Sequence, residues 1–379
     1  MFFDRNLLIF KSLNLLFFRC EVKLLCVIDS LGSGGAQRQL VNLAVSFKKK
    51  GHDVDFLVYY KDNFYLDYLE KNKINVIQAI EGNYLKRILK MRKIIRSGQY
   101  DSILSFLEVP NLICELASFP FKEWKLVVGE RSANPKIFFS KKLKLYRKFH
   151  FFADAVVANS FENINIVRKV NPALSSSKCH VIYNMVDFDK WAPNRSEYIF
   201  RKNGKLKIVI AARHHYLKNL NVLVEAVHLL NTEDKDHLHI EWYGRVEDHS
   251  YTDAVKKISE YGLNHVFFFH DPVSEINQIV NKADVVGLFS FYEGLPNTVC
   301  EGMVNSKPII ASNVSDVGRL IDEGFIFNPE NPVELSQLLE KILQMNKHEL
   351  QQLGLQNREK ALELFDENFI SDKYLELMS

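Results

Sequence analysis

The stretch EGLPNTVCE carries two carboxylates, Glu293 and Glu301, at a junction between a strand and a helix. The apolar run DVVGLFS before it is typical of a buried strand, and Pro296 suits the first position of a helix over 297–305. Free N–H groups at a helix start favour a phosphate, while a carboxylate beside them accepts hydrogen bonds from sugar hydroxyls. The stretch predicts a site for a ligand with sugar and phosphate parts. The alternative is a plain corner with two solvated glutamates.

A second group of residues could bind phosphate. In ARHHYLKN, Arg213 stands at the end of a predicted strand and Lys218 follows five residues later, before a helix. Two cations at this spacing could hold a diphosphate from both sides and stabilise it as it leaves. Taken alone, the pair is more typical of solvated surface.

The glycines of LGSGGAQ, residues 31–37, follow a predicted strand and open a helix. The run is not a dinucleotide fingerprint, because Gln37 stands where GxGxxG needs its last glycine and no acid ends the next strand. The glycines permit close approach of the backbone to a ligand, so a cleft loop competes with a plain tight turn.

Strand and helix patterns alternate along both halves of the chain, which predicts an α/β protein with two doubly wound, Rossmann-like domains facing across a cleft. With 379 residues, of which 47% are hydrophobic, the chain can bury two cores. The expected parts are an apolar extension (1–22), a first domain (23–190), a linker (191–205), a second domain (206–360) and a C-terminal helix that packs back toward the first domain (361–379).

Composition limits the function classes. The net charge of +3 gives no reason to expect nucleic acid. No HExxH is present and the adjacent His214 and His215 would not converge on one ion, so we expect no metal site. The cysteines are odd in number and form no CxxC pair, which fits a reducing cytoplasm; they are Cys20, Cys26, Cys114, Cys179 and Cys300.

Three segments bear on membranes. Polar and charged residues interrupt every apolar run at the start of the chain, so no membrane span is expected there, and the lack of a small-residue cleavage site argues against a secretory signal. An extension before the first strand is expected, and an interfacial amphipathic segment is the alternative. The stretches 84–96 and 135–152 mix basic with apolar or aromatic residues, and both could touch anionic lipid. The alternative for each is a sheet-packing helix with a solvated basic face.

Residues 23 to about 365 resemble the retaining glycosyltransferases of family 4, which have the GT-B architecture of two Rossmann-like domains. The resemblance rests on GSGGAQRQLVNLA, GERSANP, ARHHYLKN and FSFYEGLPNTVCEGMVNSKPIIASNVSDV. The last run is most similar to enzymes of bacterial O-antigen and capsule assembly.

The resemblance implies a role for each matching position. The first domain would bind the acceptor and the second the nucleotide sugar. Arg213 and Lys218 would bind the donor's diphosphate, Glu301 the ribose hydroxyls and Glu293 the transferred sugar. The donor site would be completed by backbone and glycines, which are Gly34, Gly35, Gly294, Leu295, Pro296 and Asn297.

One loop departs from the family pattern. Many relatives carry a histidine after the fifth strand, where this chain has Glu130 and Arg131. These two residues are therefore candidates for contact with the sugar or the acceptor.

The implied reaction moves a sugar, with retention and without a metal or cofactor, from a UDP- or GDP-linked donor to an acceptor hydroxyl. The resemblance implies a same-face mechanism in which the leaving phosphate helps to deprotonate the acceptor. The expected acceptor is an undecaprenyl-linked or lipopolysaccharide-type glycan, and the expected location is the cytoplasm, peripherally on the cytoplasmic face of the inner membrane. Two alternatives stay open: a GT-B sugar-nucleotide epimerase, and a non-catalytic subunit that binds nucleotide sugar or lipid.

Overall fold

The structure is a computed structural model that describes residues 21–132, 135–194 and 198–379. The expected extension over 1–22 lies outside the described residues except for its last two positions. The same holds for two residues of the loop after the fifth strand and for three residues of the expected linker.

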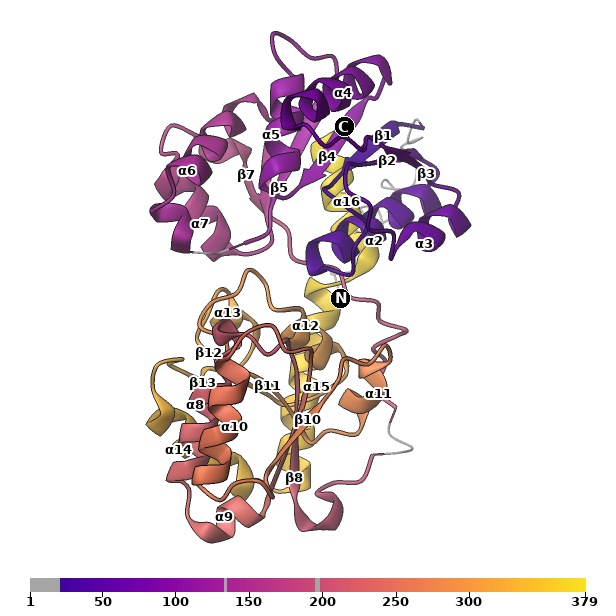
Figure 1. Ribbon diagram of the computed structural model, residues 1–379. Helices are drawn as coiled ribbons and strands as arrows, with labels where there is room; N and C mark the ends of the chain where they lie inside the picture. The colour runs from indigo at the N-terminus through magenta and orange to yellow at the C-terminus, as the bar shows by residue number, and fades with distance from the viewer. Residues whose placement is uncertain (1–20, 133–134, 195–197) are drawn as a thin grey trace, which may run out of the picture.

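The described strands form two parallel sheets, one above the other in Figure 1, and this confirms the predicted doubly wound α/β architecture. The first sheet has the order β3-β2-β1-β4-β5-β6-β7 and the second the order β10-β9-β8-β11-β12-β13. The first sheet consists of β1 (Lys23–Val27), β2 (Asp53–Val58), β3 (Asn75–Gln78), β4 (Ser102–Phe106), β5 (Lys125–Glu130), β6 (Ala155–Ala158) and β7 (Cys179–Val181). The second consists of β8 (Leu206–Ala211), β9 (Leu238–Tyr243), β10 (Phe267–His270), β11 (Val285–Leu288), β12 (Ile309–Ser312) and β13 (Ile326–Phe327).

Helices cover both faces of each sheet, and the central strands are therefore buried along their whole length and mostly apolar. Every residue of β4, β6, β11 and β12 is buried. The helices of the first domain are α2 (Gly35–Lys49), α3 (Leu66–Lys71), α4 (Tyr84–Ser97), α5 (Glu108–Ala117), α6 (Lys141–Lys148) and α7 (Phe161–Val170). Those of the second are α8 (Leu220–Leu229), α9 (Thr232–Asp236), α10 (Ser250–Glu260), α11 (Ile276–Asn281), α12 (Asn297–Val304), α13 (Val317–Leu320) and α14 (Pro332–Gln344).

The last two helices connect the domains. Helix α15 (Lys347–Leu364) packs against α12 in the second domain, and α16 (Glu367–Met378) crosses to the first domain, where it contacts α2, β4 and β5. Figure 1 shows this crossing in yellow. The chain end thus belongs to the core of the first domain, where Tyr374 and Met378 are buried.

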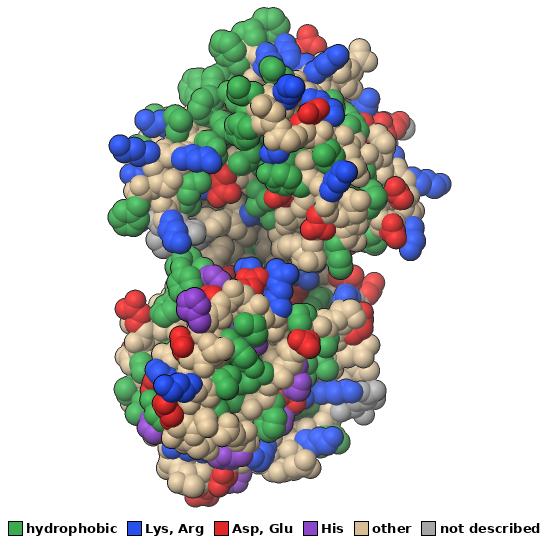
Figure 2. Space-filling model, viewed as in Figure 1, with side chains coloured by type: hydrophobic (Ala, Val, Ile, Leu, Met, Phe, Trp, Pro, Cys, Tyr) green, Lys and Arg blue, Asp and Glu red, His purple; other side chains and the backbone are tan. Residues whose placement is uncertain are grey.

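The first domain exposes a group of large apolar side chains, here called the apolar surface: Leu85, Leu89, Phe119, Phe121 and Phe151. Helix α4 is connected to the segment after α5, because Arg92 donates a hydrogen bond to the Phe119 carbonyl and Arg96 donates one to the Phe121 carbonyl. Figure 2 shows hydrophobic side chains, with Lys and Arg among them, over the end of the domain that α4 forms. In the part of the chain that the structure describes, no helix combines the length and the hydropathy needed to cross a membrane.

Candidate active site

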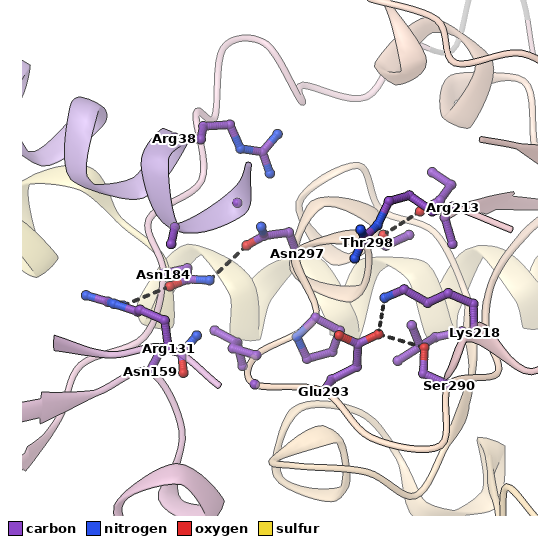
Figure 3. Close-up of a pocket in the computed structure, with 18 of the residues that line it drawn as sticks. Arg38, Arg131, Asn159, Asn184, Arg213, Lys218, Ser290, Glu293, Asn297 and Thr298 are labelled. Atoms are coloured by element: carbon purple, nitrogen blue, oxygen red, sulfur yellow. Dashed lines mark hydrogen bonds and ion pairs between the residues drawn. The ribbon is translucent and has the colours of Figure 1, made fainter. Parts of the chain in front are cut away.

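A cavity of about 520 Å³ lies between the two domains and is lined by both. Its walls are the loops at the carboxyl ends of strands, which is where open parallel sheets bind ligands. The first domain contributes the segments after β1, β5 and β6, and the second those after β8 and β11. Figure 3 shows their side chains pointing into one space.

Two helices begin at this cavity, one from each domain. Neither α2 nor α12 has a side-chain cap at its N-terminus or an acidic residue in its first turn. Their first residues are close, since a Cβ on Gly35 would lie 3.1 Å from Nδ2 of Asn297. Pro296 is the cap of α12, one residue before its predicted position. Two sets of free N–H groups, each at the positive end of a helix dipole, therefore face the same space.

Lys218 and Glu293 form an ion pair at the edge of the cavity. The Lys218 Nζ lies 2.5 Å from Oε1 of Glu293, and the Ser290 hydroxyl donates to the same oxygen at 2.6 Å. Lys218 ends a 3₁₀ turn (Tyr216–Lys218) after β8, and Glu293 lies in the turn between β11 and α12. The two loops therefore meet at one edge of the cavity (Figure 3).

Arg213 stands after β8 and lines the cavity from the second domain. Its guanidinium lies 2.8 Å from Oε2 of Glu247, and its side chain is 56% exposed. Burial would raise the pKa of Glu247, but hydrogen bonds from Arg213 and Arg245 outweigh it and lower this pKa. Arg213 is thus a charged group with room to move toward a ligand.

Arg131 lines the cavity from the first domain. Its guanidinium stacks on the Phe106 ring, 3.5 Å from the centroid, and donates to the Tyr374 hydroxyl at 2.5 Å and to Asn184 at 3.2 Å. Burial lowers the pKa of Arg131. Asn184 in turn donates to Oδ1 of Asn297 at 2.8 Å, which links this wall to the second domain.

Glu130 points away from the cavity, into a buried cluster. Its carboxylate lies 2.6 Å from Arg147 and 2.9 Å from His150, whose other ring nitrogen is 2.6 Å from Glu115. Burial would lower the pKa of His150, but the charges of Glu115 and Glu130 and the hydrogen bonds to them raise it to about 9. The cluster holds the end of β5 in place and leaves Arg131, its neighbour, on the cavity side.

Glu301 lies within α12, about one turn after its first residue, and is paired across the domain boundary. Its Oε1 accepts a hydrogen bond of 2.5 Å from the guanidinium of Arg38, which is in the first turns of α2. Burial raises the pKa of Glu301, and the charge of Arg38 opposes this.

A third contact between the domains involves Asp316, which is 3% exposed. Its carboxylate accepts hydrogen bonds from the first two amides of α7, those of Phe161 and Glu162, at 2.8 and 3.2 Å. The Tyr183 hydroxyl donates to it at 3.1 Å. Close approach also requires Gly294, because a Cβ there would lie 2.7 Å from the Arg131 carbonyl oxygen.

Most of the predicted site residues meet in this one cavity. Its lining includes Arg131, Arg213, Lys218, Gly35, Glu293, Gly294, Leu295, Pro296 and Asn297. Gly34, Glu130 and Glu301 stand outside the lining. Sequence reasoning missed Arg38, Asn159, Asn184 and Ser290, which also line the cavity. Arg38 had a signal, since it follows Gly35 by three residues and so lies within a turn of the glycine loop. Across the described ranges, no three His, Cys, Asp or Glu residues are grouped as a metal site would require.

Comparisons with known proteins agree with this arrangement. Residues 33–190 match the family model described as Glycosyltransferase Family 4, and residues 205–345 match the model described as Glycosyl transferases group 1. The boundary between the two matches falls between the two sheets.

Two curated relatives come from Campylobacter jejuni. The first is 23% identical over 94% of this chain and 98% of its own length, and is named as an alpha-1,4-N-acetyl-D-galactosaminyltransferase for a GalNAc-GalNAc-diNAcBac-PP-undecaprenol. The second is 25% identical over 86% of this chain and 91% of its own length, and is named as an N-acetylgalactosamine-N,N'-diacetylbacillosaminyl-diphospho-undecaprenol 4-alpha-N-acetylgalactosaminyltransferase.

Among solved structures, HepE of Anabaena in complex with UDP superimposes with a TM-score of 0.82. The match covers 93% of this chain and 98% of HepE, at 18% identity, and it shows a shared GT-B fold. The two family matches together span most of the chain and have the same order as its two domains. The chain belongs to the family 4 glycosyltransferases.

Proposed function

We propose that this glycosyltransferase moves a sugar from a nucleotide diphosphate sugar to a hydroxyl of a lipid-linked glycan. The observation that carries the proposal is the convergence of two uncapped helix N-termini, those of α2 and α12, with Arg213 and Lys218 in one cavity. Free amides at helix starts, together with cations, make a site suited to a diphosphate.

The donor would lie across the domain boundary. Its diphosphate would bind the helix amides, Arg213 and Lys218, and its ribose hydroxyls would donate hydrogen bonds to Glu301. The transferred sugar would lie against Glu293, whose carboxylate can accept hydrogen bonds from hydroxyls. Support for this orientation comes from the partners of the two carboxylates. Glu293 pairs with Lys218 of the second domain, whereas Glu301 pairs with Arg38, which lines the cavity from α2.

In the reaction, the bond between the anomeric carbon and the diphosphate oxygen breaks and a bond to the acceptor oxygen forms on the same face of the sugar. The acceptor proton passes to the leaving phosphate. Arg213, Lys218 and the helix amides would stabilise the charge that develops on the diphosphate, without need of a metal. Lys218 and Ser290 hold Oε1 of Glu293, which leaves Oε2 to accept a hydrogen bond from a hydroxyl of the transferred sugar.

The acceptor would enter through a second cavity of about 220 Å³, which borders the first at Lys218 and Glu293. Its lining includes Arg131, His215 and Tyr292, groups that can hold polar parts of a glycan. The names of the Campylobacter relatives place their acceptors on undecaprenyl diphosphate. We infer the same class of acceptor here, in the synthesis of a cell-surface glycan such as O-antigen or capsule.

A lipid-linked acceptor calls for contact with a membrane. The apolar surface of the first domain, with Arg92 and Arg96 beside it, would lie against anionic lipid on the cytoplasmic face of the inner membrane. Phe121 and Phe151 are 68% and 70% exposed and belong to a group of exposed apolar side chains, and such a patch is typical of an interaction surface.

Thermal unfolding in the presence of nucleotides tests the donor site. We expect UDP or GDP to raise the Tm of the wild-type protein, because a ligand that binds only the folded state stabilises it. R213M should lose most of this increase in Tm. K48M, which also removes one positive charge but lies in the last turn of α2, should keep it. A wild-type Tm that no nucleoside diphosphate or nucleotide sugar moves would count against the proposal.

A further inference from the structure

The ion pair of Arg38 and Glu301 joins residues that are 263 positions apart in the chain. Glu301 is nearly buried, with 12% of its side chain exposed, and Arg38 has 36% exposed. A buried carboxylate without a partner is costly, so Arg38 compensates Glu301 in the ligand-free protein. The pair spans the domain boundary at 2.5 Å, and Arg38 also lines the donor cavity.

The pair conflicts with the proposed position of the donor. If the ribose hydroxyls bind Glu301, as the proposed function requires, they approach the carboxylate that Arg38 now holds. Two ribose hydroxyls that bind the carboxylate would take one oxygen each, so one of them would meet Oε1, the oxygen that Arg38 holds in this nearly buried place. The ribose would therefore replace Arg38, and the released guanidinium would need another anion nearby.

That anion is available in the donor itself. Arg38 lies in α2, whose free N-terminal amides face the same cavity. Arg213 and Lys218 would approach the diphosphate from the second domain, whereas Arg38 would approach it from the first. A guanidinium is flat and forked, and it suits phosphate oxygens as well as it suits a carboxylate.

We propose that Arg38 is a donor-binding residue that exchanges partners: it holds Glu301 in the ligand-free protein and the donor's diphosphate once the ribose has taken Glu301. The inference rests on the proposed function, because it needs a nucleotide diphosphate in the cavity. It makes closure of the two domains around the donor depend on a residue of the first domain that reaches across the boundary.

The exchange predicts different effects on a nucleoside and on its diphosphate. R38M removes the charge and keeps the length of the side chain. It should weaken UDP binding, or GDP binding if that is the nucleotide, by about tenfold to a hundredfold, the worth of a charge-assisted hydrogen bond. Binding of uridine, or of guanosine, should stay within about threefold of the wild type or become tighter, since the competing cation is gone.

Calorimetry with UDP and GDP, and competition with uridine and guanosine, measure both effects in the full chain. R38K keeps the positive charge but loses the forked guanidinium, so it should weaken binding of the nucleoside diphosphate less than R38M does. K48M is the matched control on α2, where Lys48 pairs with Asp53 away from the cavity. Far-UV circular dichroism establishes that each variant is folded.

Two results would overturn the exchange. If R38M lost the same factor of affinity for the nucleoside as for its diphosphate, Arg38 would only position Glu301. If R38M kept the wild-type affinity for both, Arg38 would contact neither. A wild-type protein that binds neither UDP nor GDP would instead contradict the proposed function, so the two failures are distinct.

Discussion

The ammonium group of Lys218 lies 2.5 Å from Oε1 of Glu293, and the Ser290 hydroxyl donates to that same oxygen. The three side chains come from two loops that follow neighbouring strands, β8 and β11. In the proposed function, Lys218 would lie beside the departing diphosphate and Glu293 beside the transferred sugar.

K218M and E293Q test whether this pair acts on the transition state. Each should lower kcat by about a hundredfold to a thousandfold, the size of effect seen when one preorganised charge or donor is removed. S290A, which removes only the hydroxyl beside Glu293, should lower kcat by about tenfold or less. Steady-state kinetics separates kcat from KM, and a near-normal kcat in both K218M and E293Q would exclude the assigned roles.

D316A tests whether the hydrogen bonds of Asp316 hold the two domains together. Asp316 accepts from two amides of α7 and from Tyr183 across the boundary. Each hydrogen bond to a charged group contributes about 1.5–3 kcal/mol, so D316A should shift the protein toward an open state. Small-angle X-ray scattering should report a larger radius of gyration for D316A. Y183F keeps the amide contacts and should change it less; identical radii in D316A and the wild type would show that closure does not depend on Asp316.

The buried cluster around His150 makes stability depend on pH. The folded pKa of about 9 is above the ordinary value of 6.5, so the protonated ring favours the folded state. The contribution is complete below pH 6.5 and is lost as the pH rises toward 9. At about 1.4 kcal/mol per pKa unit, the loss is on the order of 3 kcal/mol.

Urea unfolding of the wild type and of H150Q at pH 6 and pH 9.5 measures this loss. The free energy of unfolding should fall with pH much more in the wild type than in H150Q, which has no ring to titrate. Parallel declines in the two proteins would show that His150 is not charged in the folded state.

The membrane contact predicts that F121S combined with F151S lowers binding to vesicles. Both rings are more than half exposed, so the changes should leave the fold intact, while the lost apolar contacts should weaken binding about tenfold or more. Co-sedimentation with vesicles of phosphatidylglycerol and phosphatidylcholine provides the measurement. L229S, at an exposed leucine of the second domain, is the control, and equal vesicle binding by all three proteins would refute the assignment of this surface.

Much of this architecture can be read from the sequence, because each βα unit has local signals. Buried parallel strands give continuous apolar runs, and the turn after β11 carries both the carboxylate Glu293 and the start of a helix. The orientation of Glu130 could not be read in this way, since it depends on Arg147 and His150 from a later segment. The pairs of Arg38 with Glu301 and of Asp316 with α7 depend on how the two domains meet, and no local pattern encodes that.

Acceptor-dependent release of nucleoside diphosphate is the most direct test of glycosyl transfer at this site. The protein would be incubated with the nucleotide sugar that raises its Tm most, with and without a panel of undecaprenyl-diphosphate-linked glycans. We predict that UDP or GDP appears only when an acceptor is present, in equal amount to the extended glycan, and that K218M abolishes both. Binding of the nucleotide sugar without release, or recovery of an epimerised sugar nucleotide in place of an extended glycan, would contradict the account.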